Sequence, residues 1–439
     1  MFKMAIVSVA AAVVGIHSAG FFVGSKEKES FISRVTLEEH CDLEASAFAV
    51  ENLTNGEIRP FRYGEAFIRA KESDWLKVVL NKDFSAVYFD GEKIRAGKQV
   101  KVVQNCSSET TLDNIFDTLR PVLVDLRSRV LDRPPAPEIT GYFPIDKQRD
   151  LCNEVAETFG YDFSRGRIDT AVHPFCSGTG NDVRITTRFD ENDPLGSIYS
   201  TIHEVGHALY EQNIDQIYSF SNIGRGVSMG VHESQSRILE NQLGRSESLA
   251  DWLFKKFFDY FGDIGCKDST SFYKSINSVK NGFIRTESDE LQYNLHVLLR
   301  YRLEKWLFDG DLNANDLEYV WNEEFEKDFG LAIEKPSDGI LQDVHWSEGL
   351  FGYFPTYSLG NVYAGCLFEA MQIQIPALNE NLNSGDLTEA IAWLANSVQK
   401  HGSLYSPVDL IQNACGFDIT AEPLISYIEK KFSSTYNLN

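Results

Sequence analysis

The feature that most constrains this chain is a pair of histidines four residues apart, His203 and His207, with Glu204 directly after the first. Four residues is slightly more than one helical turn, so both imidazoles lie on one face only if the segment is an α-helix. On such a helix the two rings can bind a single zinc ion, while Glu204 points to the adjacent side, where a water molecule would be activated. The spacing therefore predicts a helical zinc site of the hydrolytic kind.

A third metal ligand must come from elsewhere, because a catalytic zinc has three protein ligands and one open position. The segment 231–237 supplies two adjacent candidates, His232 and Glu233. Adjacent side chains on a helix point about 100° apart, so we expect only one of them to face the metal, and spacing alone does not choose. Glu211 and Glu240 are lesser candidates.

The apolar pattern after about residue 145 is helical. It predicts helices over 246–261, over 286–308 with Thr286 and Asp289 as a capping box, and over 387–400 with Gly402 ending the last of them. We therefore expect a mainly α-helical body.

Two segments alternate with period two instead. Residues 182–188 predict one short strand, a small β element next to the zinc helix, and residues 85–103 predict a hairpin around Asp90 and Gly91.

The charge balance limits the partners. The chain of 439 residues has 41 Lys and Arg against 64 Asp and Glu, a net charge of −23, and we find no basic patch. A field of this sign repels phosphate backbones and anionic lipid surfaces, so we expect neither nucleic-acid nor membrane binding. The seven cysteines form no CxxC pair, which favours reduced thiols.

The N-terminus has one targeting-like feature, an apolar run from Met4 to Ile16 that follows Lys3. The run is too short to span a bilayer. We expect a buried N-terminal helix and a cytoplasmic protein; the alternative is an exported protein whose residues 1–20 are a signal peptide.

Several blocks, in order, resemble the carboxypeptidase Taq type of zinc metallocarboxypeptidase, metallopeptidase family thirty-two. They are 143–149, 173–175, 182–188, 203–212, 232–237, 284–296, 342–347 and 352–357. The resemblance covers roughly residues 110–439. It implies a helical catalytic domain over 111–439, while residues 1–110 form a divergent segment and a partial roof over the substrate groove.

The resemblance implies a nearly all-helical homodimer with one zinc per chain, for which cobalt can substitute. It selects Glu233, the acid of the HES block, as the third ligand. It also implies a deep groove closed at one end, which binds peptides by their free C-termini. The residues it associates with closing the groove are His173, Pro174, Phe175, Asp182, Arg184 and Thr186.

Catalysis needs further groups besides the metal. Glu204 is the expected general base, and a phenol near the metal would stabilise the oxyanion, with Tyr357 the first candidate and Tyr353 the second. A bidentate arginine recognises a terminal carboxylate best, and we expect Arg285 to do so.

Three more residues, Arg188, His296 and His345, complete the predicted groove. Arg184 and Arg188 are alternatives to Arg285, and His296 and His345 lie in blocks that match the family.

The sequence thus predicts a metallocarboxypeptidase that releases single amino acids, with broad specificity but poor cleavage of C-terminal Asp or Glu. One alternative is a zinc oligopeptidase with an open groove. The other is a catalytically silent helical protein that binds zinc, which the presence of Glu204 disfavours.

Overall fold

The computed structural model describes residues 109–438, except 220 and 222, and five strands within residues 57–96. The chain forms two compact units. One contains residues 113–342 and 354–439, and the other contains residues 1–112 and 343–353. The predicted signal peptide and N-terminal helix lie outside the described residues.

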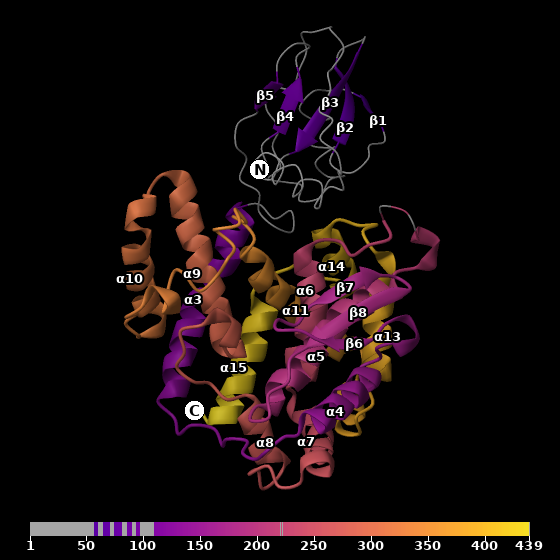
Figure 1. The fold of residues 1–439 in the computed structure, drawn as a ribbon, viewed down its shortest axis with the longest axis vertical. Helices are drawn as coiled ribbons and strands as arrows, with labels where there is room; N and C mark the ends of the chain where they lie inside the picture. Colours follow the sequence, from indigo (N-terminus) through magenta and orange to yellow (C-terminus); the bar gives the residue numbers. More distant parts are fainter. Residues whose placement is uncertain are drawn as a thin grey trace. The chain divides into compact units, whose positions relative to one another are not determined.

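The larger unit is built mainly from helices (Figure 1). Its first half contains α3 (Glu109–Leu131, which begins in the other unit), α4 (Ile145–Thr158), α5 (Pro194–Asn213), α6 (Met229–Arg237), α7 (Glu247–Phe261) and α8 (Ser269–Ile276). Its second half contains α9 (Glu290–Asp309), α10 (Leu317–Phe329), α11 (Pro355–Gln374), α12 (Leu378–Asn383), α13 (Thr388–Ser397), α14 (Pro407–Cys415) and α15 (Glu422–Tyr436).

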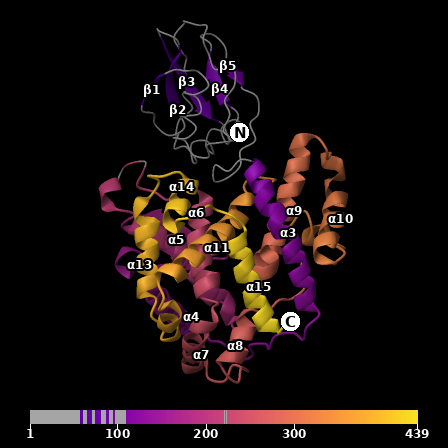
Figure 2. The same cartoon turned by 180° about the vertical axis from the view of Figure 1, so that it is seen from behind.

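Helix α11 forms the centre of this unit. Almost every residue from Pro355 to Met371 is buried, as expected of a helix that is covered on all sides. Helices α6, α9, α14 and α15 pack against it, and Figure 2 shows α14 near α6 from behind. The hydrophobic core of the larger unit is thus built around α11.

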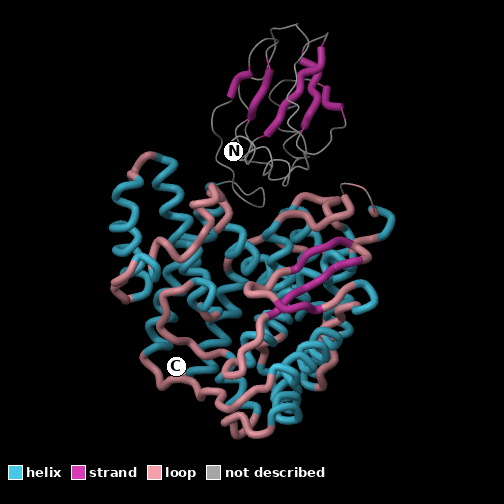
Figure 3. Tube along the Cα trace, viewed as in Figure 1, coloured by secondary structure: helices cyan, strands magenta, loops and turns pink. Residues whose placement is uncertain are grey.

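A three-stranded sheet lies beside α5 (Figure 3). It consists of β6 (Ile168–Thr170), β7 (Cys176–Thr179) and β8 (Asp182–Thr187), with β8 in the middle, parallel to β6 and antiparallel to β7. Thr187 ties β8 to α5, because its hydroxyl donates to the Ser197 carbonyl at 3.0 Å and lies 2.7 Å from the Ser200 hydroxyl. The predicted strand next to the zinc helix is confirmed.

The predicted helices are found with shifted boundaries. The helix predicted over 246–261 is α7, which begins one residue later because Ser246 is its N-cap. The prediction for 286–308 was wrong at its start: residues 285–287 form a 3-10 turn, and Asp289 caps α9 by accepting from the Gln292 amide. The helix predicted over 387–400 is α13, which ends at Ser397. A 3-10 turn follows it and precedes Gly402.

In the smaller unit the described strands form an antiparallel sheet in sequence order: β1 (Glu57–Arg59), β2 (Glu65–Ala70), β3 (Asp74–Leu80), β4 (Ala86–Phe89) and β5 (Ile94–Ala96). Tyr88 pairs with Arg95, and Phe89 with Ile94, which confirms the predicted hairpin. Among the described residues, no helix is long and apolar enough to cross a membrane. The five cysteines in the described part of the chain form no disulfide.

Candidate metal centre

Helix α5 presents the histidine pair. It begins at a strong cap, since the Asp193 carboxylate accepts from the amides of Leu195 and Gly196 at 3.1 and 3.3 Å, and Pro194 occupies its first turn. His203 and His207 follow two turns later on one face, with their ring centroids 5.0 Å apart. The predicted helix is therefore present and places both imidazoles together.

Glu233 of α6 completes a group of three ligands. Its Oε2 lies 3.9 Å from His203 Nε2 and 3.7 Å from His207 Nε2. Two ligands of a tetrahedral zinc, each about 2.0–2.2 Å from the ion, lie roughly 3.4 Å apart. The three side chains would therefore fit a metal ion with small adjustments. In the described part of the chain, this is the group of histidine, cysteine and carboxylate side chains that could hold a metal ion.

Two glycines allow the helices to approach so closely. A Cβ on Gly206 of α5 would lie 2.4 Å from the Ser236 Cα, so α5 and α6 cross in contact there. A Cβ on Gly360 of α11 would lie 2.5 Å from the Glu233 Cγ. The core helix α11 therefore limits the position of Glu233.

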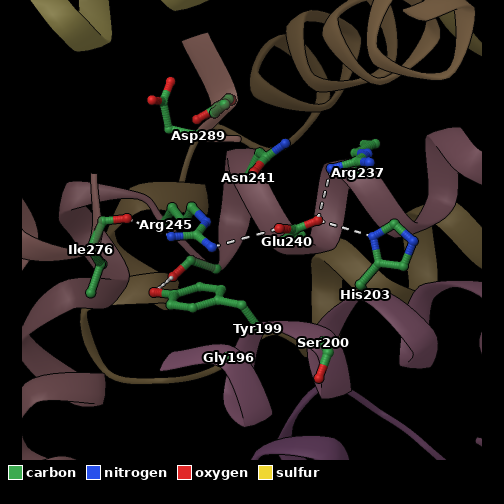
Figure 4. A network of polar contacts seen from close by, with 12 residues as sticks. Gly196, Tyr199, Ser200, His203, Arg237, Glu240, Asn241, Arg245, Ile276 and Asp289 are labelled. Carbon is green, nitrogen blue, oxygen red and sulfur yellow. Dashed lines mark hydrogen bonds and ion pairs between the residues drawn. The ribbon is translucent and has the colours of Figure 1, made fainter. Parts of the chain in front are cut away.

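The Nδ1 atom of His203 is held from outside the group. It lies 2.9 Å from Oε2 of Glu240, a residue of the π-helical turn η4 (Ile238–Leu243), as Figure 4 shows. Arg237 donates to Glu240 at 3.2 Å, and Arg245 lies 3.6 Å away on the other side. Burial alone would raise the pKa of Glu240, but Arg237, His203 and Arg245 together lower it. This carboxylate is charged and orients the ring, so that Nε2 faces Glu233.

Arg237 donates hydrogen bonds to both Glu233 and Glu240. Its Nε donates to Glu233 Oε1 at 2.7 Å, which leaves Oε2 facing the histidines, and its guanidinium lies 4.3 Å from the centroid of the Tyr293 ring. Neighbouring carboxylates keep the pKa of this arginine above its usual value in spite of burial. Pattern analysis missed Arg237, although a spacing of four from Glu233 on a helix indicates such a contact.

Glu204 is buried next to the three ligands, with 6% of its surface exposed. Burial raises the pKa of its carboxyl to about 7, to which Glu233 and Glu240 add, while His203 opposes the rise. A carboxylate with a pKa near neutrality can both accept and return a proton, as a general base requires. The role of Glu204 as the base stays a prediction.

His232, the other candidate for the third ligand, takes a different place. Its Nδ1 lies 3.0 Å from the Nδ1 of His207, and its Nε2 lies 2.8 Å from Oε1 of Glu211. Both ring nitrogens of His232 thus have partners, and His232 is not a member of the group of three. Likewise Glu240 and Glu211, the lesser candidates, contact histidines instead of joining the group of three.

Arg285 and Tyr357 lie close together, while their roles toward substrate stay predictions. The Arg285 guanidinium lies 5.0 Å from the Tyr357 ring centroid, and one of its nitrogens donates to the Tyr293 hydroxyl at 3.1 Å. Tyr293 therefore contacts both Arg285 and the Arg237 that holds Glu233. Tyr293 was not predicted, because only the fold brings 237, 285 and 357 together.

The residues associated with closing the groove come from two segments, 173–175 and 182–186, which lie side by side at the small sheet. The Phe175 amide donates to the Thr186 hydroxyl at 2.9 Å. Arg184 makes two hydrogen bonds to Asp182, at 2.8 and 2.9 Å, and both side chains are exposed.

Three further predicted groove residues lie in or next to these two segments. His173 and Arg188 are exposed, and Pro174 is half-buried.

The remaining predicted groove residues differ in their surroundings. His296 is 1% exposed, and its ring lies 4.5 Å from that of Phe329, so its position in the helical core gives no support to substrate contact. His345 and Tyr353 belong to the smaller unit, where their rings lie 5.4 Å apart. Their contact with substrate stays a prediction.

Comparison with known proteins decides the family. The model of the carboxypeptidase Taq (M32) metallopeptidase family matches residues 78–432. The chain belongs to this family. The predicted resemblance is confirmed, and the match begins about thirty residues before the boundary expected near residue 110.

Individual relatives agree with the family model. Carboxypeptidase 1 of Bacillus subtilis is 40% identical over 335 residues, which are 74% of this chain and 66% of the relative. Thermostable carboxypeptidase 1 of Thermus thermophilus is 38% identical, covering 73% of this chain and 64% of the relative. The chain thus spans slightly less than two thirds of these relatives.

The fold is shared as well. The crystal structure of the M32 carboxypeptidase from Deinococcus radiodurans matches with a TM-score of 0.74 and 38% identity, over 75% of this chain and 68% of that one. The predicted mainly helical body with a small β element is confirmed. Membership of a metallopeptidase family implies a divalent metal, and the group of three ligands is where this chain would hold it.

Proposed function

We propose that this chain is a zinc-dependent carboxypeptidase that releases single amino acids from the free C-termini of peptides. The observation that carries the proposal is Glu204, buried beside the His203, His207 and Glu233 group and with its pKa raised to about 7. A structural metal site needs no such base. The family and the names of the relatives support the same activity.

The donor set favours zinc. Two imidazole nitrogens and one carboxylate oxygen, with a fourth position open, form the ligand set of catalytic zinc peptidases, and cobalt accepts the same geometry. A bound zinc ion would polarise the scissile carbonyl and lower the pKa of the attacking water. Zinc also needs neutral histidines, and the contacts of both Nδ1 atoms leave the two Nε2 atoms for the metal.

The chain's own residues supply the remaining steps. Glu204 removes the proton of the water and returns it to the leaving amine. Arg285 binds the terminal carboxylate, and the Tyr357 hydroxyl stabilises the charge that develops on the scissile carbonyl oxygen. Tyr293 orients Arg285 through its hydroxyl.

We infer the substrate specificity from the net charge of the protein, and the closed groove and the homodimer from the family resemblance. With a net charge of −23, the protein repels acidic C-terminal residues, so we propose broad specificity with Asp and Glu disfavoured. A groove closed at one end and a homodimer are the arrangement that the family resemblance supports, and the cytoplasm remains the proposed location.

Replacing Glu204 by Gln tests the proposal. The variant removes the base but keeps the size of the side chain, so the bound zinc measured by mass spectrometry of metals should stay at one per chain while turnover falls at least about a hundredfold. Glu369→Gln, an exposed position on α11, is the matched control and should leave both unchanged. Full turnover by the Glu204 variant would exclude the assigned base.

A further inference from the structure

The two metal-binding histidines have different outer partners. The Nδ1 of His203 meets the charged carboxylate of Glu240, whereas the Nδ1 of His207 meets another imidazole, that of His232, at 3.0 Å. The His207 and His232 rings are tilted by 49°, with centroids 5.1 Å apart, so the contact is made edge to edge by the nitrogens rather than by stacking. Nothing in the proposed reaction uses His232.

Glu211, on the other side of the His232 ring, determines which nitrogen donates in the contact between His207 and His232. His232 Nε2 lies 2.8 Å from Oε1 of Glu211, and a carboxylate can only accept, so this nitrogen carries the hydrogen. A neutral imidazole then has a bare Nδ1. His207 must therefore donate from its Nδ1, which leaves the lone pair of its Nε2 on the side of Glu233.

Gly226, which precedes α6, contacts His232 and limits the position of its ring. A Cβ on Gly226 would lie 2.6 Å from His232 Cδ2, so only glycine leaves room for the ring. The Gly226 amide also donates to Glu211 Oε1 at 3.2 Å, and the Tyr210 ring lies 4.9 Å from the His232 ring on another side. Backbone and side chains thus hold the imidazole and the carboxylate together.

We propose that His232 is a positioning residue which, held by Glu211, fixes His207 as the tautomer whose Nε2 binds the metal. The inference rests on the proposed function, because it needs a metal at this group. In this arrangement the affinity for the metal depends on the His207–His232–Glu211 chain on one side and on Glu240 on the other. Outer partners of this kind change metal affinity by about 10–100-fold when removed.

Zinc affinity measured by competition with a chromogenic chelator at fixed pH tests the proposal on the full chain. We expect His232→Ala and Glu211→Ala each to weaken zinc binding about 10–100-fold. His232→Gln should recover part of the loss, because its amide oxygen can accept from His207 Nδ1. Tyr210→Phe, which keeps the ring against His232 and removes only a hydroxyl bonded to Gly402 and Val227, is the control and should bind as the parent does.

Unchanged affinity in the two alanine variants would overturn the inference, and so would an equal loss in Tyr210→Phe, which would indicate a general loosening of the loop. A parent chain that binds no zinc would instead contradict the proposed function.

A second measurement needs no variant. Long-range proton–nitrogen NMR of the zinc-loaded protein with labelled histidines should show a proton on His232 Nε2 and none on its Nδ1, and the reverse pattern would refute the proposal.

Discussion

Arg237 gives the sharpest test of how the site is held together. Replacing it by Met keeps the length and apolar body of the side chain but removes the charge that lies between Glu233 and Glu240, at 2.7 and 3.2 Å. All three side chains are at most 14% exposed, so water cannot replace the guanidinium. Two acids would then remain buried without their shared cation.

The magnitude follows from these contacts. At an effective dielectric constant near 20, two charges about 4 Å apart interact by roughly 4 kcal/mol, so the two pairs together give about 8 kcal/mol before desolvation. Removing the arginine from water costs several kcal/mol, which leaves a loss of about 3–5 kcal/mol in the free energy of unfolding of the metal-free chain. A divalent ion would restore part of this, because it supplies positive charge beside Glu233.

The assay is urea unfolding of the parent and Arg237→Met, each with chelator and with saturating zinc. Arg129→Met removes an exposed pair with Asp125 on α3 and is the control, with an expected loss below about 1 kcal/mol. The Arg237 variant should lose more stability with chelator than with zinc. A loss below about 1 kcal/mol without metal, or a larger loss with zinc, would refute the reasoning.

Four further predictions concern the site and its substrates. Gly360→Ala should push Glu233 away and cost about 1–3 kcal/mol of stability, and calorimetry together with chelator competition would show both effects; an unchanged zinc affinity would contradict the close contact. Zinc affinity should fall as the solution becomes more acidic, by up to roughly tenfold per pH unit, because His203 must lose its proton to bind metal. Glu233 and Glu240 outweigh burial and raise the pKa of His203, and a flat profile from about pH 5 to 8 would count against this sign. Arg285→Lys, which keeps the charge but loses the planar fork, should lower kcat/KM for free C-termini by roughly 10–100-fold without changing bound zinc, and steady-state kinetics on a tripeptide would reveal an unchanged value if the arginine has no such role. On the parent enzyme, the same assay should show slower release of C-terminal Asp or Glu than of Ala or Leu, and equal rates would contradict the argument from charge.

Local patterns predicted the parts of the site that depend on helical spacing. The His203 and His207 pair, with Glu204 as the expected base between them, required only a helix. The caps of α5 and α7 support those two helices. The choice of Glu233 over His232 required the family resemblance. The two residues are adjacent on a helix, and their spacing from the histidine pair does not show which of them faces the metal.

The rest depends on tertiary contacts that a single sequence does not encode locally. Arg285 and Tyr357 were predicted from their chemistry together with the blocks that resemble the family. The contacts that Tyr293 makes with Arg285 and Arg237 are visible only once α6, α9 and α11 pack together. The same holds for Gly360, whose contact with Glu233 depends on how closely α11 approaches α6. The predicted start of α9 was wrong because Asp289, not Thr286, caps it.

The central claim is metal-dependent removal of single residues from a free C-terminus. The most direct test follows one peptide by mass spectrometry over time, with free and amidated C-termini in parallel, on zinc-loaded and chelator-stripped protein. We predict stepwise loss of single residues from the free form only, abolished by the chelator. Internal cuts in both forms would contradict the claim in favour of an oligopeptidase with an open groove, and zinc binding without any cleavage would contradict it in favour of a catalytically silent protein.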